Sequence, residues 1–252
     1  MKFSIITPSY NQKDYIGRTM DSVIGQKFND FEYLVFDGNS TDGTCDILRQ
    51  RQAEIHHLCI EKDNGQPHAI NKGFKKVTGD IIGWINSDDK YLPNVLEKVA
   101  NAFKDPEVMW VTSDCEVIDE NDQSIDLYTT KLPESYSQWL ALFIQGHSTA
   151  LLQPPTFWRK EVMHNVGLLN EKFHYSFDHE FFFRIFKKYG PPKVLDTPLA
   201  QFRLHSESKT MSEDRRFKKE NMAIGVMHAH TVPFKKKLYL YALYLRAWFK
   251  NA

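Results

Sequence analysis

The sequence has few cysteines and no long hydrophobic run. Its 252 residues include three cysteines, Cys45, Cys59 and Cys115, whose number and spacing fit neither a disulfide framework nor a metal site. The first residues enter a strand-like run without the apolar segment of a secretory signal, and no apolar stretch is long enough to span a bilayer. These absences predict a cytoplasmic protein that is neither secreted nor transmembrane.

An excess of charge of one sign is also absent. Basic and acidic residues each number 32, which gives a formal net charge of +0. This balance argues against a protein whose main role is to bind nucleic acid. The chain also lacks the phosphate-binding glycine loop of kinases, the dinucleotide fingerprint and the nucleophilic serine elbow of hydrolases.

The pattern that is present is an alternation of strands and helices. Continuous β-rich runs at 3–8, 33–36, 55–60, 81–85 and 108–112 are separated by segments with helical spacing, such as 14–24 and 92–103. Such alternation predicts an α/β fold with a mostly parallel central sheet flanked by helices.

The second half of the chain has a less regular pattern. Turn signals at 121–122 predict an antiparallel hairpin over 116–130, and 135–143 and 178–188 read as helices. Residues 153–159 must be extended because of two successive prolines, and short strands are expected at 194–196 and 200–205. The polar segment 206–216 is the predicted boundary between a domain at 1–205 and a C-terminal helical extension at 206–252.

Two predicted strands end in acidic loops. Asp37 follows the strand at 33–36, and Asp88 and Asp89 follow the strand at 81–85. The carboxyl ends of such strands are where open α/β sheets bind ligands, and a carboxylate there suits a Mg²⁺ or Mn²⁺ that bridges a diphosphate. The alternative is structural, since Asp37 could cap a turn and Asp88 and Asp89 could cap the next helix.

These loops together resemble a known family. Segments 7–11, 37–44 and 86–89 lie in the right order on alternating strands and helices, and 177–184 and 203–208 add two further matches. With this combination the chain resembles the family 2 inverting glycosyltransferases of GT-A fold over about residues 3–205. The resemblance implies a nucleotide-diphospho-sugar transferase fold, with a nucleotide-sugar-binding half at 1–115 and an acceptor half at 116–205.

The resemblance implies a set of nucleotide contacts. Asp37 is expected to accept a hydrogen bond from the imide N–H of a uracil base, because a carboxylate can only accept. The other residues expected beside the nucleotide are Thr7, Pro8, Tyr10, Asn64, Gly65, Asn71, Asn86 and Ser87. Asn64, Gly65 and Asn71 could equally mark the start of a helix.

The resemblance also implies a metal site. The family's Asp-X-Asp motif falls on Asn86, Ser87 and Asp88, so an amide replaces the first acid. Asp88 is then the expected ligand of Mg²⁺ or Mn²⁺, with His205 reaching the metal or the diphosphate from the C-terminal side. The loss of one charge suggests a cation held mainly by the substrate diphosphate. As an alternative, His205 is an edge histidine bonded to the backbone.

Asp178 matches the family's general base, six residues ahead of Arg184, and Glu180 is the second choice. Asp178 could also cap its helix. In the segment 153–159, Phe157 and Trp158 would offer faces to a sugar and Arg159 would bind a phosphate, unless the segment is an aromatic edge of the core.

The implied activity is metal-dependent transfer of a hexosyl or N-acetylhexosaminyl group. The donor would be a nucleotide-sugar, with UDP as the expected nucleotide. The acceptor would be a hydroxyl of a glycan or a polyprenyl-linked molecule in bacterial surface polysaccharide synthesis. A competing reading is a catalytically degenerate nucleotide-sugar-binding protein with a role in assembly or regulation, motivated by Gly38 and Asn86 where relatives carry acids. A nucleotidyltransferase would need a glycine-rich basic loop after the first strand, which the sequence lacks.

The last expected helix, at 234–250, is apolar round much of its circumference and basic at both ends. Lysines at its start could reach anionic head groups while tyrosine and leucine enter the interface. We expect peripheral attachment to the inner face of the cytoplasmic membrane. The same residues would suit packing on the catalytic domain, or on a second copy of the chain in a homodimer.

Overall fold

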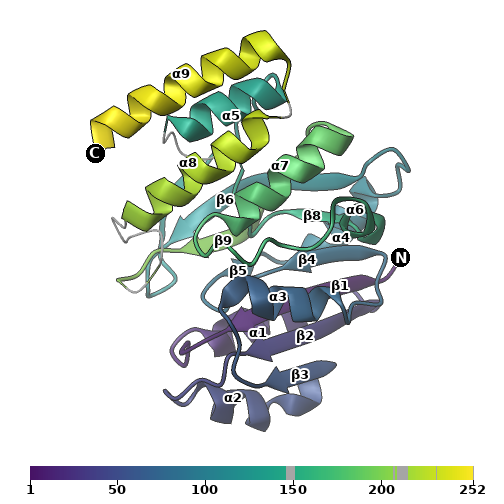
Figure 1. The fold of residues 1–252 in the computed structure, drawn as a ribbon. Helices are drawn as coiled ribbons and strands as arrows, with labels where there is room; N and C mark the ends of the chain where they lie inside the picture. The colour runs from purple at the N-terminus through teal and green to yellow at the C-terminus, as the bar shows by residue number, and fades with distance from the viewer. Residues whose placement is uncertain (146–150, 207, 209–214, 231, 252) are drawn as a thin grey trace.

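A computed structural model describes residues 1–145, 151–206, 208, 215–230 and 232–251. In these residues a nine-stranded sheet has the order β3-β2-β1-β4-β8-β6-β9-β5, with β7 paired to β6 outside this path. Helices cover both faces of the sheet (Figure 1). The predicted α/β fold is therefore confirmed.

The first half of the sheet is parallel. It consists of β1 (Phe3–Ser9), β2 (Phe31–Asp37), β3 (His57–Ile60) and β4 (Ile81–Trp84). They alternate with α1 (Ile16–Ile24), α2 (Thr44–Gln50), the 3₁₀ helix η1 (Gln52–Glu54) and α3 (Gln66–Phe74). The parallel order brings the loops after these strands to one edge of the sheet.

The second half of the sheet is mixed. It contains β5 (Lys90–Tyr91), β6 (Trp110–Ile118), β7 (Ser124–Tyr128), β8 (Phe157–Arg159) and β9 (Lys193–Arg203), with α4 (Val95–Ala102), α5 (Tyr136–Ile144), α6 (Lys160–Val166) and α7 (Phe177–Tyr189). The predicted hairpin is the antiparallel pair β6 and β7. The two short strands expected at 194–205 are one strand, β9, because it stays paired with β6 across an irregularity between Ser113 and Cys115.

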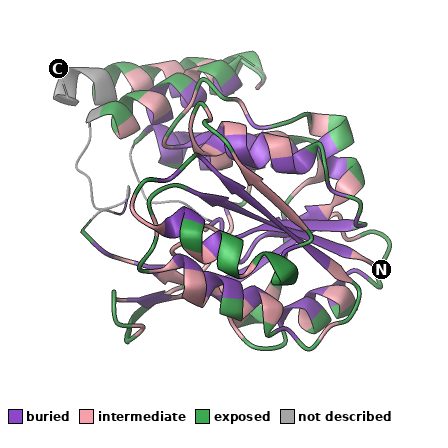
Figure 2. Cartoon of the chain, turned by 90° about the horizontal axis from the view of Figure 1, so that it is seen from below, coloured by how far each residue is buried: buried purple, intermediate pink, exposed green. Residues whose placement is uncertain are grey.

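The strands bury side chains on both faces. Along β1, Ile5 packs in the core beneath α1 and α4, whereas Ile6 packs in the core beneath α3 and α7. This alternation follows from the two-residue period of a strand, and two covered faces explain why the run at 3–8 is apolar without interruption. Figure 2 shows the strands buried and the outer sides of the helices exposed.

A buried carboxylate joins the strands at the edge of the sheet opposite the acidic loops. Glu32 of β2 accepts hydrogen bonds from the Ser4 hydroxyl, from the Thr78 N–H at 2.6 Å and hydroxyl at 2.8 Å, and from Lys2 Nζ at 3.1 Å. Burial alone would raise the pKa of Glu32, but the bonds from Ser4, Thr78 and Lys2 outweigh burial and lower this pKa to about 2.

The C-terminal extension contains α8 (Arg215–Ala229) and α9 (Phe234–Asn251), which pack on α5 and on each other (Figure 1). Leu240 of α9 is buried, whereas Phe234, Leu238, Tyr239 and Leu245 are exposed. Among the described helices, none combines the length and the apolar character that crossing a bilayer needs. Most of the predicted boundary at 206–216 lies outside the described residues, so this division of the chain stays a prediction.

Candidate active site

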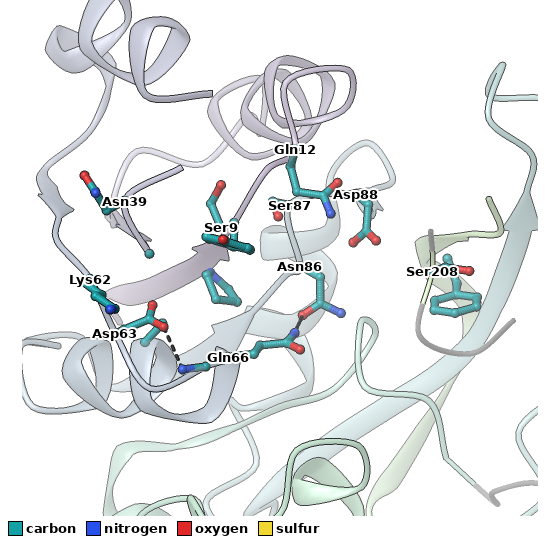
Figure 3. Close-up of a pocket in the computed structure, with 16 residues that line it drawn as sticks. Ser9, Gln12, Asn39, Lys62, Asp63, Gln66, Asn86, Ser87, Asp88 and Ser208 are labelled. Atoms are coloured by element: carbon teal, nitrogen blue, oxygen red, sulfur yellow. Dashed lines mark hydrogen bonds between the residues drawn. The ribbon is translucent and has the colours of Figure 1, made fainter. Parts of the chain in front are cut away.

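A cavity of about 740 Å³ opens where β1, β2 and β4 end. Lys62, Asp63 and Asn39 lie on one side of it, and Gln12, Ser87 and Asp88 lie on the other (Figure 3). The remaining lining residues are Pro8, Ser9, Tyr10, Gly38, Gly65, Gln66, Ala69, Asn86, Phe202 and Ser208. The cavity therefore occupies the carboxyl edge of the parallel strands, where the acidic loops were expected to meet.

Six of the residues predicted to contact a nucleotide or a metal line this cavity: Pro8, Tyr10, Gly65, Asn86, Ser87 and Asp88. Tyr10 is 61% exposed at its rim, so its ring offers a face to a ligand. Thr7, in contrast, is fully buried and accepts a hydrogen bond from the Tyr33 hydroxyl at 3.0 Å. Thr7 does not line the described cavity.

In the segment 64–71, Asn64 and Asn71 make hydrogen bonds that stabilise the fold around α3. Gly65 precedes α3 with a φ of 105°, a left-handed conformation that favours glycine, and the Asn64 N–H donates to His68 Nδ1. The Asn71 side chain is buried and forms paired bonds with the Leu169 N–H and carbonyl, at 2.9 and 3.0 Å. Asn71 therefore fastens α3 to the chain before α7 and does not face the cavity.

Asp37 is buried, and both of its carboxylate oxygens are bonded within its own loop. They accept from the Ser40 N–H and the Ser40 hydroxyl, both at 2.7 Å, and from the Cys45 thiol. The carboxylate therefore holds the loop that carries Gly38 and Asn39 to the cavity wall, as the turn-capping alternative predicted. The described lining residues do not include Asp37 itself.

On the side of the cavity where Asn39 and Lys62 lie, the carboxylate belongs to Asp63. One of its oxygens accepts the Gly65 N–H at 2.7 Å, and a methyl group added at Gly38 would lie 3.0 Å from the other oxygen and 3.2 Å from Tyr10. The absence of a side chain at Gly38 thus leaves room for both Tyr10 and Asp63 close to its backbone. Sequence reasoning missed Asp63, although an acid directly before the Asn-Gly turn was visible in the sequence.

Asp88 and His205 lie together although 117 residues separate them. His205 Nε2 lies 3.1 Å from Asp88 Oδ2, and the buried imidazole rests against the Tyr15 ring with centroids 4.7 Å apart. The structure therefore brings together the two predicted metal ligands. No group of three or more His, Cys, Asp or Glu that could hold a metal occurs within the described part of the chain.

Asp89, next to Asp88, has a different position. It is 1% exposed and accepts hydrogen bonds from the Arg203 N–H at 2.9 Å and from Asn86 Nδ2 at 3.0 Å. Burial, and then the charge of Asp88, raise the pKa of Asp89 well above its usual range. Asn86 also accepts from Gln66 Nε2 at 2.8 Å (Figure 3), so the amide that replaces the first acid of the motif links α3 to Asp89.

Asp178 lies in the first turn of α7, and Ser176 is the N-cap residue. The Oδ1 atom of Asp178 accepts the His179 N–H at 2.8 Å and lies 2.9 Å from His179 Nδ1. Burial alone would raise the pKa of Asp178, but the charge of His179 and these hydrogen bonds lower it below its ordinary value. The carboxylate is therefore ionised at neutral pH and can accept a proton. Asp178 does not line the described cavity. The ring of the neighbouring Phe177, however, lies with its centroid 6.5 Å from that of Trp84 at the end of β4.

Glu180 is not available as a base in this arrangement. It is 2% exposed, forms a bidentate pair with Arg184 at 2.8 to 3.1 Å, and lies 3.4 Å from His228 Nε2 of α8. Burial alone would raise the pKa of Glu180, but bonds from His228 and Arg184 lower it. A carboxylate held in this way is occupied by structural partners.

The predicted sugar pocket at 157–159 does not face the cavity. Phe157 and Trp158 are fully buried in β8, between β4 and β6, and their rings pack against core aromatics. Arg159 donates to the carbonyls of Phe103, Asp105 and Val108. The placement corresponds to the alternative of an aromatic core edge, because a strand in the middle of a covered sheet cannot expose either side.

Comparison with known proteins identifies the class. Residues 4–165 match the family model described as glycosyl transferase family 2, and the chain belongs to this family. It is 29% identical over 218 residues to an uncharacterized glycosyltransferase of Nostoc, an alignment covering 84% of this chain and 67% of that protein. It is 41% identical over 98 residues, 38% of this chain and 39% of the other, to the putative teichuronic acid biosynthesis glycosyltransferase TuaG of Bacillus subtilis.

The fold also occurs in a solved structure. S. aureus TarS 1-349 in complex with UDP-GlcNAc has a TM-score of 0.71 with this protein at 20% identity. The match covers 99% of this chain and 73% of that chain. At this identity the match establishes a shared α/β fold, and the predicted fold class, including its helical C-terminal part, is confirmed.

Proposed function

We propose that this glycosyltransferase transfers a sugar from a nucleotide-sugar to a hydroxyl group with inversion of configuration, assisted by a divalent metal. The observation that carries the proposal is the meeting of Asp88 and His205 beside a cavity of about 740 Å³ at the carboxyl edge of the parallel strands. Ligand sites in proteins commonly have such a volume, and open α/β sheets bind at this edge.

For the donor we propose a UDP-sugar. The exposed Tyr10 ring can stack on a base, and Asp63 offers a carboxylate oxygen on the same side of the cavity to an imide N–H such as that of uracil. Asp37 would act on the base indirectly, by holding the loop with Gly38 and Asn39. The UDP-GlcNAc in the complex with TarS supports this choice of nucleotide.

Asp88 and His205 supply only two of the ligands that a divalent metal needs. One carboxylate and one imidazole, 3.1 Å apart, suit a Mn²⁺ or Mg²⁺ whose other ligands are diphosphate oxygens and waters. When bound, such an ion would neutralise charge on the departing diphosphate. Asn86 donates a hydrogen bond to the buried Asp89, so these two residues would stabilise the turn that carries Asp88.

Asp178 is the proposed general base. Its lowered pKa keeps it ionised at neutral pH, so it can take the proton of the acceptor hydroxyl as the oxygen attacks the anomeric carbon. The bond to the nucleotide diphosphate breaks on the opposite face, which inverts the configuration. No covalent intermediate is needed.

The acceptor we propose is a glycan or a polyprenyl-linked molecule of the bacterial surface. The name of the Bacillus relative, which refers to teichuronic acid biosynthesis, supports a role in surface polysaccharide synthesis. A lipid-linked acceptor would place the enzyme at the inner face of the cytoplasmic membrane. The exposed Phe234, Leu238 and Leu245 and the lysines at 235–237 of α9 would provide the contact.

The test combines a donor panel with one variant. Purified protein is incubated with Mn²⁺ and UDP-glucose, UDP-galactose, UDP-N-acetylglucosamine, UDP-N-acetylgalactosamine or GDP-mannose, and nucleotide release is measured. Asp178→Asn should reduce turnover with the best donor by about 10²-fold or more while leaving the dissociation constant of UDP within a few-fold. Full turnover in the variant would refute the base assignment. A protein that binds UDP but turns over no donor, with or without acceptor extract, would support the degenerate binding protein instead.

A further inference from the structure

The turn that leads into the base-bearing helix is held by the C-terminal extension. Glu220 of α8 accepts three consecutive peptide N–H groups, from His174 at 2.8 Å, Tyr175 at 2.8 Å and Ser176 at 3.1 Å. The next residue, Asn221, accepts the Ser176 hydroxyl through Oδ1 at 2.5 Å, and both of these side chains are buried. Four hydrogen bonds thus join two residues of α8 to one turn, across 44 to 46 residues of sequence.

These bonds hold the residues just before α7 and do not cap the first turn of the helix itself. The first N–H groups of a helix lack partners within the helix, and a serine at the N-cap commonly accepts one of them. Ser176 is the N-cap of α7 but makes no such bond, and its hydroxyl donates to Asn221. The chain where it enters α7 is therefore held from outside the helix, by a carboxylate and an amide of α8.

The held turn lies near the cavity wall at His174 and leads directly to the proposed base. Asp178 follows Ser176 by two residues, and its nearest hydrogen-bond partner is the adjacent His179. On the other side, a methyl group added at Gly65, which lines the cavity, would lie 3.5 Å from His174 Nδ1. The residues bonded to Glu220 thus connect the carboxylate of Asp178 to the cavity wall.

A second contact ties the same two helices further along. His228 of α8 lies 3.4 Å from Glu180 of α7, and its other ring nitrogen lies 2.6 Å from the Tyr136 hydroxyl of α5. Helix α8 is therefore joined to the chain just before α7 and again to the first turn of α7.

We propose that Glu220 and Asn221 are positioning residues, which hold Asp178 in the orientation needed to take the acceptor proton. The inference rests on the proposed base role of Asp178. A misplacement of about 1 Å can cost about 10²-fold in rate, which is the scale of effect expected when such a support is removed.

Glu220→Gln is the test variant because it keeps the size of the side chain and one acceptor oxygen while placing an amide N–H₂ against peptide N–H groups. We expect turnover with the best donor of the panel to fall by about 10-fold to 10²-fold. The KM for the donor and the dissociation constant of UDP with Mn²⁺ should stay within about two-fold, because the α8 side chains do not line the described cavity. Asn221→Ala, which removes one bond, should lower turnover by a smaller factor.

Two controls separate positioning from general loss of structure. Glu97→Gln removes a carboxylate from the exposed side of α4, so turnover should be unchanged. In the Asp178→Asn background, Glu220→Gln should reduce the residual turnover by less than about two-fold, because a support has no further effect once the base is absent.

The outcomes are distinguishable. If Asp178→Asn is fully active, the proposed base is wrong. If Asp178→Asn is inactive while Glu220→Gln and Asn221→Ala both keep full turnover, the base stands and the positioning role is overturned. Equal fold losses for Glu220→Gln in the presence and absence of Asp178 would also overturn it.

Discussion

Replacing Glu32 by Gln should destabilise the protein in a pH-dependent way. Glu32 is 8% exposed, and its hydrogen bonds from Ser4, Thr78 and Lys2 lower its pKa from 4.5 to about 2. Multiplying this difference by about 1.4 kcal/mol for each pKa unit gives about 3 kcal/mol. Lys2 is 40% exposed, so part of its attraction is screened, and we expect about 2 to 3 kcal/mol at pH 7.

The sign of the pH dependence follows from the lowered pKa. Because the folded protein holds Glu32 ionised more strongly than the unfolded chain does, the contribution is fully present above pH 4.5 and is lost as pH falls toward about 2. At about pH 3 less than half of it should remain. The free energies of unfolding of the natural protein and of Glu32→Gln should therefore converge as the solution becomes acidic.

Urea unfolding followed by circular dichroism at several values between pH 7 and pH 3 measures this difference. Glu107→Gln, at an exposed position between α4 and β6, is the matched control and should give a difference below about 0.3 kcal/mol at all of these values. A Glu32→Gln difference below about 0.5 kcal/mol at pH 7, or one that does not change with pH, would refute the reasoning.

Three other changes test the site, the core and the surface. Asp88→Ala should weaken Mn²⁺-dependent UDP binding by about tenfold or more in calorimetry, and unchanged affinity would remove Asp88 from the metal site. Gly83→Ala should lower the free energy of unfolding in urea by about 1 to 3 kcal/mol, because the new methyl group would lie 2.6 Å from a ring carbon of the buried Phe157. In Gly17→Ala the new methyl group would have no atom within 4 Å, so this free energy should be unchanged or higher. The double change Phe234→Ser and Leu238→Ser should reduce sedimentation with phosphatidylglycerol vesicles by about tenfold or more, and failure of the natural protein to bind them would refute the membrane contact.

The order of the elements, and the edge of the sheet where the cavity lies, could be predicted from the sequence. Apolar runs such as 3–8 are a local property, and alternation with helices forces parallel neighbours whose loops meet at one edge. The acidic turn at Asp88 could be singled out by the change in polarity at the end of its strand, whereas His205 was singled out by the resemblance to the family. The structure brings these two residues to 3.1 Å.

Which side chains can reach a ligand depends on contacts that appear only in the folded protein. Trp158 is buried because β8 pairs between β4 and β6, and the sequence of β8 carries no signal of its neighbours. The Asp37 carboxylate is hydrogen-bonded within its own loop, whereas Asp63 lines the cavity. Asp63 can lie close to the backbone of this loop because position 38 is a glycine. Glu220 reaches the turn before α7 from 44 to 46 residues away. Periodicity reports only which side of an element is apolar, so partners of this kind depend on contacts between segments that are distant in the chain.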